Sequence, residues 1–231
     1  MTRGASSPGD IRDAPAYTFA AAARHLGMPP ATLRSWVLGR IYRRGGEVVE
    51  TEPLIRAPAG SRSPISFNTL VEAHVLRAIR TKDGVRMGAV RKAIAYAEES
   101  LGIDRLLLSD ELRTSGQDIF LDRLRELITL TKSGQLAMKQ MLLAYLKRVD
   151  RDDEALPLRL YPLRPAWSED RKPIVIDPRV SFGRPTVAGS GISTVALVDR
   201  VDAGEDLETL ARDYSLSIGQ IEDAVFYERA A

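Results

Sequence analysis

The chain has 231 residues, of which 44% are hydrophobic and 28% charged, and its formal net charge is +2. These values are typical of a globular protein that buries a core, and the absence of cysteine excludes disulfides, thiolate metal sites and cysteine nucleophiles. No apolar segment approaches 18 residues, so we expect a cytoplasmic protein with no membrane partner.

The segment 17–40, YTFAAAARHLGMPPATLRSWVLGR, has the pattern of two short helices joined by a tight corner. Thr18 can cap the first helix through its hydroxyl, and Gly27 can end it in a left-handed conformation. A second helix, opening at the proline pair, would turn Leu33 and Val37 inward. This pattern favours a helix-turn-helix, whose second helix enters the DNA major groove, although a packing hairpin would show the same corner.

Arginine dominates the charge of this region. Residues 1–46 contain seven arginines and two aspartates, and the first eighty residues contain no lysine. The planar guanidinium suits phosphates and guanine edges, so the composition favours DNA. We interpret Trp36 as a packing residue. The candidate DNA-binding residues are Arg24, Thr32, Arg34, Ser35, Arg40, Arg43 and Arg44.

A hairpin is predicted directly after these helices. Residues 41–44 form a strand-like stretch, Gly45-Gly46 a turn, and the next β-forming residues run through Val49. Arg43 and Arg44 stand just before the tip, where a wing would meet the backbone of an adjacent groove. A solvated hairpin edge is the alternative.

At this point the sequence resembles the winged helix-turn-helix of the MerR family. The matching positions are Tyr17-Thr18, Ala23-Arg24, Leu26-Gly27, the run Thr32-Leu33-Arg34-Ser35-Trp36, and Gly39. The resemblance implies that Arg34 touches DNA. The family usually continues into an effector-sensing region, often with cysteines, and this chain has none.

The rest of the N-terminal and middle regions gives weaker signals. We expect a frayed terminus over residues 1–14 and a linker over 56–64. Helices are predicted from Ser66, over 87–101 and over 136–149, since their apolar residues recur with helical spacing. The stretch 112–124 predicts a short hairpin about Ser115-Gly116, and 156–163 predicts an edge strand.

Catalytic signatures are missing from the sequence. His25 and His74 are the only histidines, they fall on different predicted helices, and neither has a carboxylate at ligand spacing. We expect each to be a partly buried or surface imidazole. No nucleophile triad, paired-carboxylate motif or metal signature stands out, so we expect a protein that is not an enzyme and needs no cofactor or metal.

Residues 173–192 predict a second hairpin, with strands 174–176 and 186–188 joined by glycine-rich turns. The loop lacks the Gly-Lys-Ser/Thr ending of a P-loop and a third glycine at Rossmann spacing, which favours a structural turn network over nucleotide binding. Helices are predicted over 194–203, 207–214 and 218–228, the last capped by Ser217.

The C-terminal helices are acidic. Residues 199–228 contain nine acidic residues and two arginines, a charge that would repel phosphate. A protein partner, or a second copy of the chain, fits better. The candidate residues for that contact are Asp206, Glu208, Glu222 and Asp223.

The C-terminal part also resembles the family catalogued as domain of unknown function 433. Its hallmark is present as Phe182-Gly183-Arg184-Pro185 and Val187-Ala188-Gly189-Ser190-Gly191-Ile192, followed by Gly204, Leu210-Ala211 and Tyr214. Many members have an arginine where Gly191 stands. Combined with the MerR-like end, the chain resembles antitoxins of the VapB type, of mycobacterial kind. That resemblance implies a homodimer that binds operator DNA and neutralises a PIN-like ribonuclease toxin.

The predicted fold is mainly α with small β-hairpins. It divides into a winged helix-turn-helix domain (15–80), a helical middle region suited to dimerisation (81–165) and a C-terminal antitoxin-like domain (173–231), helical and helix-turn-helix-like with a short β-hairpin. Two other functions stay open from the residues. One is a stand-alone transcription regulator whose C-terminal domain only dimerises, and the other is an interaction module whose helix pairs are packing units.

Overall fold

The computed structural model describes residues 9–55, 65–80, 85–128, 131–168 and 170–230. The N-terminal part consists of β1 (Pro15–Tyr17), α1 (Phe19–Leu26), α2 (Pro30–Leu38), β2 (Arg40–Arg44), β3 (Glu47–Thr51) and β4 (Ile65–Ser66). The middle part consists of α3 (Phe67–Arg80), α4 (Met87–Leu101), the 3-10 helix η1 (Asp110–Arg113), α5 (Ser115–Leu127), α6 (Lys132–Leu146), β5 (Val149–Arg151) and β6 (Pro157–Leu160). The C-terminal part consists of β7 (Ile174–Val175), η2 (Ser181–Gly183), β8 (Thr186–Val187), α7 (Thr194–Asp202), α8 (Leu207–Tyr214) and α9 (Ile218–Arg229).

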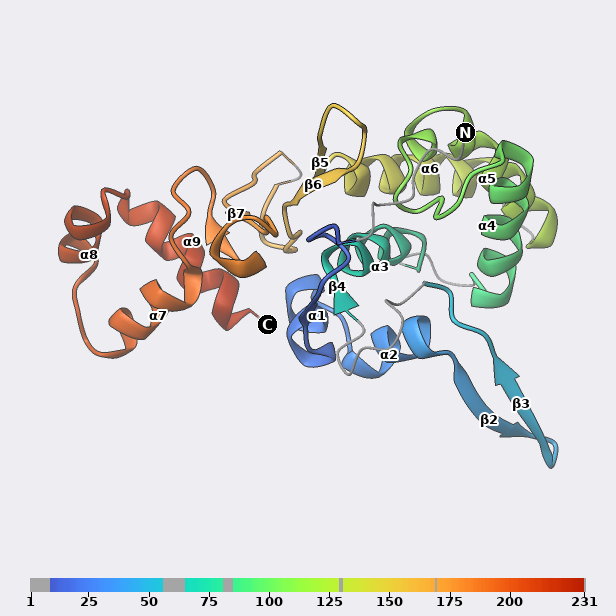
Figure 1. The fold of residues 1–231 in the computed structure, drawn as a ribbon, viewed down its shortest axis with the longest axis horizontal. Coiled ribbons are helices and arrows are strands. Elements are labelled where there is room, and N and C mark those ends of the chain that lie inside the picture. Colours follow the sequence, from blue (N-terminus) through green and yellow to red (C-terminus); the bar gives the residue numbers. More distant parts are fainter. Residues whose placement is uncertain (1–8, 56–64, 81–84, 129–130, 169, 231) are drawn as a thin grey trace.

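The predicted class, mainly α with small hairpins, is confirmed (Figure 1). The described strands pair two by two and antiparallel: β1 with β4, β2 with β3, β5 with β6, and β7 with β8. None of the helices in the described ranges is both long and apolar enough to cross a membrane.

The first helix pair forms as its local sequence predicts. The Thr18 hydroxyl accepts a hydrogen bond of 3.1 Å from the Ala21 amide, and Gly27 ends α1 with φ of 59°. In α2, Leu33, Trp36 and Val37 are buried, so Trp36 is a packing residue. The pair therefore presents the remaining face of α2 to solvent.

Helix α3 lies at the centre of the molecule, with α1 and α6 packed against it (Figure 1). Its residues from Phe67 to Ile79 are all buried except Arg77. The buried polar side chains on it are hydrogen-bonded, as burial demands. The Asn68 side chain donates to Asp13 at 3.0 Å, and His74 shares a 3.1 Å hydrogen bond with the Tyr145 carbonyl.

Two apolar clusters hold the fold together. One extends over buried residues from Tyr17 to Ile176, with α3 in its middle, and the other joins Trp167 to residues of β7, β8 and α7–α9. Ile174 and Ile176 belong to different clusters, although they are two residues apart. The strand β7 thus lies where the two clusters meet.

The expectation of a frayed terminus is wrong for residues 9–14. Arg12 forms ion pairs of 2.7 Å with Asp10 and 2.6 Å with Asp152, and the Asn68 amide donates to the Arg12 carbonyl. The polar composition that suggested fraying supplies these long-range contacts. Residues 1–8 and the predicted linker 56–64 lie outside the described residues.

The hairpin predicted over 112–124 is also wrong, because this stretch contains the end of η1 and most of α5. A Cβ on Gly116 would lie 2.8 Å from the Glu111 carbonyl oxygen. The glycine therefore permits a close approach between η1 and α5 rather than a β-turn.

The other predicted elements of the middle region are found with shifted ends. Helix α4 matches the prediction, whereas α6 begins at Lys132 behind a Thr131 cap and ends at Leu146. Val149, predicted at the end of that helix, belongs to β5. The predicted edge strand is β6, which stops at Leu160.

Candidate nucleic-acid interface and C-terminal module

The exposed face of α2 carries the residues predicted to enter a groove. Arg34 is exposed, and its guanidinium lies 4.5 Å above the Phe19 ring. Thr32 and Ser35 are half-buried beside it, and the Ser35 hydroxyl donates to the Thr32 carbonyl at 2.8 Å. The Ser35 hydroxyl therefore offers an outside partner a lone pair but not its proton.

The β2–β3 hairpin projects from the body next to α2 (Figure 1). Its strands pair in register from Arg40↔Thr51 to Arg44↔Glu47, and Gly45 and Gly46 form the turn with positive φ. Arg40 and Arg43 are exposed, and the Arg40 guanidinium lies 5.3 Å from the centre of the Tyr42 ring. The side chain of Arg44 lies outside the described part of the chain.

The hairpin is anchored to α2. The amides of Leu54 and Ile55 donate to the Trp36 carbonyl at 2.7 and 3.1 Å. At the other end of the hairpin base, a Cβ on Gly39 would lie 2.2 Å from the Thr51 carbonyl oxygen, so only glycine fits there. The orientation of the hairpin relative to α2 is fixed by these contacts.

The N-terminal arginines divide into paired and unpaired ones. Arg12 is engaged by Asp10 and Asp152, and Arg24 lies 3.8 Å from Glu228 of α9 while remaining about half exposed. Within the described residues, Arg34, Arg40 and Arg43 have no ion pair. We call these three the arginine strip. The set contains fewer arginines than the sequence indicated, and the alternation of side chains along β2 turns Arg40 and Arg43 to opposite faces of the hairpin.

A buried junction joins α1 to the C-terminal part. Arg164 is 2% exposed and donates to the carbonyls of His25 and Arg24, each at 3.1 Å, and its guanidinium lies 4.4 Å above the Tyr227 ring. Tyr227 and His25 share a 3.0 Å hydrogen bond. Arg164 thus satisfies carbonyls at the end of α1 and supplies cationic charge where the helix dipole favours it.

The two histidines are buried, not partly exposed as we expected. His25 is 4% and His74 1% exposed. Burial lowers the pKa of His25 to about 3, and the neighbouring charges of Arg24 and Arg164 add to this effect. Burial also lowers the pKa of His74 to about 3. Both imidazoles are neutral structural groups.

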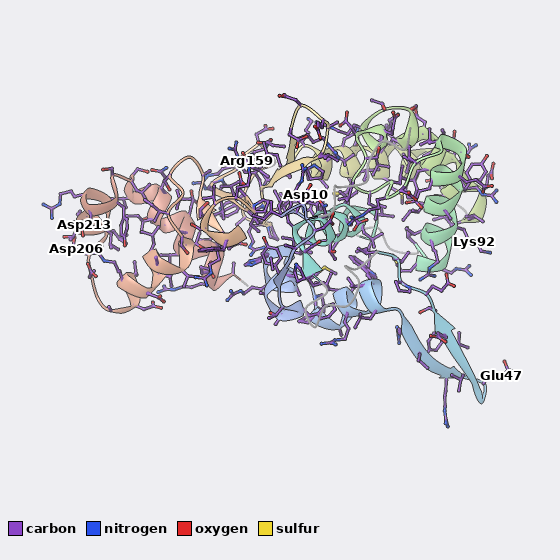
Figure 2. All side chains as sticks on the ribbon, in the orientation of Figure 1. Asp10, Glu47, Lys92, Arg159, Asp206 and Asp213 are labelled. Atoms are coloured by element: carbon purple, nitrogen blue, oxygen red, sulfur yellow. The ribbon has the colours of Figure 1, made fainter. Side chains whose placement is uncertain are left out.

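The C-terminal module, residues 173–229, folds largely as its local sequence predicts. β7 and β8 pair through Ile174↔Val187 and Val175↔Thr186. Ser217 caps α9 together with Gln220 in a capping box. The acidic end of this module lies opposite the β2–β3 hairpin, as the labels of Asp206, Asp213 and Glu47 show in Figure 2.

Most acidic residues of the module have partners. Arg200 binds Glu205 and Asp213, and Arg229 binds Asp202. Asp206 caps α8 by accepting from the Thr209 amide at 2.8 Å, although it stays exposed. These contacts fix the helices and reduce the surface charge.

Asp223 does not lie on the surface where we predicted it. It is 8% exposed and pairs with Arg171 at 2.7 Å, because the α9 face that carries it packs against the segment before β7. Burial raises the pKa of its carboxyl. Glu208 and Glu222 are exposed. On α9, Glu222 lies between the partly exposed Ile218 and Phe226 at helical spacing.

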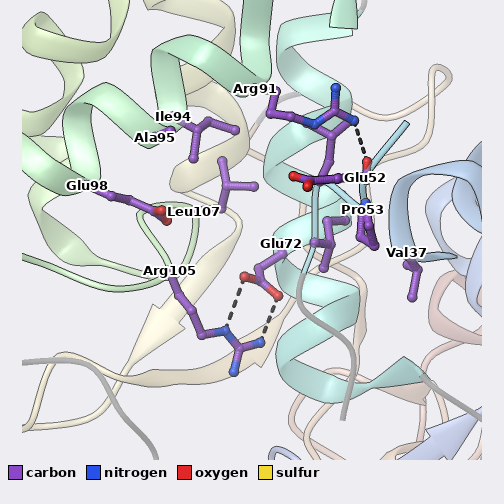
Figure 3. Close-up of a pocket in the computed structure, with 12 residues that line it drawn as sticks. Val37, Glu52, Pro53, Glu72, Arg91, Ile94, Ala95, Glu98, Arg105 and Leu107 are labelled. Carbon is purple, nitrogen blue, oxygen red and sulfur yellow. Dashed lines mark hydrogen bonds and ion pairs between the residues drawn. The ribbon is translucent and has the colours of Figure 1, made fainter. Parts of the chain in front are cut away.

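A cavity of about 800 Å³ lies between α2, the segment after β3, α3 and α4 (Figure 3). At one side the buried Glu72 pairs with Arg105 at 2.7 Å, and Arg105 also binds Asp13 at 3.0 Å. Burial raises the pKa of Glu72, and the Arg105 charge opposes that shift. Sequence spacing gave no sign of this cluster, because its members come from distant segments. Among the described residues, no three His, Cys, Asp or Glu side chains gather closely enough to hold a metal ion.

Comparison with known families assigns both ends of the chain. A family described as a "putative DNA-binding HTH domain" matches residues 15–94, and one described as "protein of unknown function (DUF433)" matches residues 174–227. The predicted helix-turn-helix and the predicted C-terminal family are thereby confirmed.

Relatives of similar length occur in Mycobacterium tuberculosis (strain ATCC 25618 / H37Rv). The "putative antitoxin VapB45" is 31% identical, with 92% of this chain and 93% of that protein covered. The "uncharacterized protein Rv2308" is 30% identical, with 94% and 91% covered. The crystal structure of Rv2018 from M. tuberculosis superposes with a TM-score of 0.69 at 27% identity, over 92% of this chain and 98% of that one.

Proposed function

This chain belongs to the family of the "putative antitoxin VapB45", and on that basis we propose that it is the antitoxin of a type II toxin-antitoxin pair. Its N-terminal domain binds operator DNA, and its C-terminal module neutralises a PIN-like ribonuclease toxin. The protein acts in the cytoplasm, where its operator lies, and has no catalytic role of its own.

The observation that carries the DNA-binding half is the arginine strip. Its three arginines are exposed and unpaired in the described structure, and they come from a helix and a hairpin held in fixed relative orientation. Exposed guanidinium groups without an internal partner suit the phosphate backbone, which supplies most of the affinity of proteins for DNA. In this arrangement α2 enters the major groove and the hairpin acts as the wing.

Roles follow from position. Arg34, Thr32 and Ser35 face the groove from α2, and Arg43 and Arg44 meet the adjacent backbone from the wing. Arg40 is the first residue of β2, at the base of the hairpin next to the end of α2. Arg24 contributes less, because Glu228 offsets part of its charge.

The toxin-binding half rests on the acidic end of the C-terminal module. Glu208 and Glu222 are exposed, and Asp206 caps α8 without being buried. Acidic side chains at a protein surface attract a basic partner and speed its association. Ile218 and Phe226, which flank Glu222 on α9, add apolar contact area to this surface.

The protein acts on DNA as a homodimer. Two-fold symmetry in a protein pairs with palindromic half-sites in an operator, and the middle region 81–165 is the part that joins the two copies. A dimer presents two arginine strips to one inverted repeat.

The experiment that tests this function starts from the native operon. The chain is co-expressed with the small nuclease encoded in the adjacent reading frame, the complex is purified, and ribonuclease activity and binding to the upstream DNA are measured. We expect a stable complex in which the nuclease is inactive, and a specific shift of the upstream fragment. DNA binding without a complex would leave a stand-alone transcription regulator instead.

A double variant separates the two halves. Arg34→Ala with Arg43→Ala should abolish the DNA shift at physiological salt and leave the nuclease inhibited. Loss of both activities would contradict the division of roles between the two ends.

A further inference from the structure

The turn η2 carries an aromatic side chain that is exposed to solvent. Phe182 is 92% exposed, and its backbone is left-handed with φ of 56°. Ser181 before it has φ of 49° and Gly183 after it φ of 74°. Residues other than glycine are strained in this region, and such strain gathers at functional sites.

The turn is held rigidly on both sides. The buried hydroxyl of Tyr17 donates to the Gly183 carbonyl at 2.8 Å, and a Cβ on Gly183 would lie 2.5 Å from that hydroxyl oxygen. The Ser181 hydroxyl donates to the Gly191 carbonyl at 3.2 Å. These contacts impose the backbone conformation that holds Phe182 out in solvent.

Stability does not account for phenylalanine at this position. The ring is almost fully exposed, so it adds nothing to the core, and glycine or asparagine would adopt the same backbone at lower cost. A rigid, exposed aromatic side chain is instead the kind of group that dominates binding when it enters a pocket of a partner.

The charges around the ring indicate the kind of partner. Arg159 and Arg179 both bind the buried Asp177, at 3.1 and 3.3 Å. Arg184 is exposed and, within the described chain, has no ion pair. Because Arg159 and Arg179 share one carboxylate, they and Arg184 leave a net charge of +2 (3 − 1) near the turn. This patch is smaller than a phosphate-binding surface, which uses several cations. It fits an apolar protein pocket with carboxylates at its rim.

We propose that Phe182 is the anchor by which this chain seats in an apolar pocket of its ribonuclease toxin, with Arg184 pairing to a carboxylate at the rim. This rests on the toxin-binding role proposed above and adds a second contact to it. Charged surfaces mainly govern the association rate, whereas a buried anchor mainly governs dissociation. The acidic end and the Phe182 turn therefore make separable contributions.

Kinetics of binding to the purified toxin test the proposal, with the toxin immobilised and full-length variants as analytes. Phe182→Ala should raise the dissociation rate by roughly thirtyfold or more, the size typical of a hot spot, and leave the association rate nearly unchanged. Phe182→Asn should do the same while melting no lower than the parent, because asparagine tolerates the left-handed backbone. Ile11→Ala, which trims an exposed apolar side chain outside the surfaces proposed for DNA, toxin and dimer contacts, is the matched control and should change neither rate.

Several results would overturn the anchor. An unchanged dissociation rate in both Phe182 variants would do so while leaving the toxin-binding function intact. Failure of the parent chain to bind the toxin would remove both proposals. Loss of operator binding in Phe182→Ala would assign the ring to DNA, and dissociation of a homodimer would assign it to a second copy. A lower melting temperature in Phe182→Asn would give the ring a structural role.

Discussion

Replacing Arg34 by alanine probes the arginine strip most directly. Arg34 is exposed and unpaired, and its guanidinium rests on the Phe19 ring of α1. Removing one phosphate contact from a DNA-binding protein lowers the slope of log affinity against log salt by about 0.9. Between 50 and 200 mM salt the parent should therefore lose about 3.5-fold more affinity than Arg34→Ala does. The double variant with Arg43→Ala should widen that factor to about twelvefold.

The assay is fluorescence anisotropy of a labelled operator fragment, titrated at several concentrations of KCl. Arg212→Ala on α8 is the matched control, because Arg212 is also exposed but lies in the C-terminal module, outside the N-terminal domain and the middle region proposed to join the two copies. Its slope should equal that of the parent. Arg24→Ala should change the slope by less than Arg34→Ala, because Glu228 already offsets part of the Arg24 charge.

Folding must be checked in the same samples. The stacking of Arg34 on Phe19 contributes about 0.5–1 kcal/mol at an exposed site. Its removal should lower the melting temperature by no more than about 2–4 °C. If Arg34→Ala with Arg43→Ala leaves the salt slope at the parent value, α2 and the hairpin do not form the DNA surface. If Arg34 reads a base instead, discrimination at one operator position falls by roughly 1–3 kcal/mol.

Three further predictions concern stability and the partner. His25 and His74 are buried with pKa values near 3, whereas an unfolded histidine titrates near 6.5, so acid protonates the unfolded chain first and stability falls as pH drops below about 6.5. Urea unfolding should show a decrease of about 2 kcal/mol per histidine between pH 7 and pH 5, and a flat profile would contradict this. Glu222→Lys should slow association with the toxin, measured by stopped flow at low salt, and leave operator binding unchanged; an unaltered association rate would move the contact elsewhere. Gly183→Ala should lower stability by about 1–3 kcal/mol, because the added Cβ strains the backbone and clashes with the Tyr17 hydroxyl. Gly189 has a similar φ but no atom near an added Cβ, so Gly189→Ala should lower the melting temperature by less. Equal decreases in the two variants would show that the clash is unimportant.

The amino-acid sequence by itself determined the local elements. Thr18, Gly27 and Ser217 mark helix ends through hydrogen bonds and backbone angles that span only a few residues. These ends can therefore be predicted from the sequence without knowledge of the fold. The Gly45-Gly46 turn set the hairpin for the same reason. Ser115-Gly116 misled us because a glycine needed for close packing looks the same in sequence as one needed for a turn.

Tertiary structure alone decided which charges remain available. Arg24 pairs with Glu228 and Arg12 pairs with Asp152, although the members of each pair are far apart in sequence. Asp223 is buried and pairs with Arg171. The hydrogen bonds between His25 and Tyr227 and between Tyr17 and Gly183 likewise join residues more than 100 positions apart. Hydrophobic periodicity and capping act over one or two helical turns, whereas burial and ion pairing depend on which elements the packed core brings together. A count of arginines and carboxylates therefore gives the charge of a segment, and only the fold shows how much of it faces a partner.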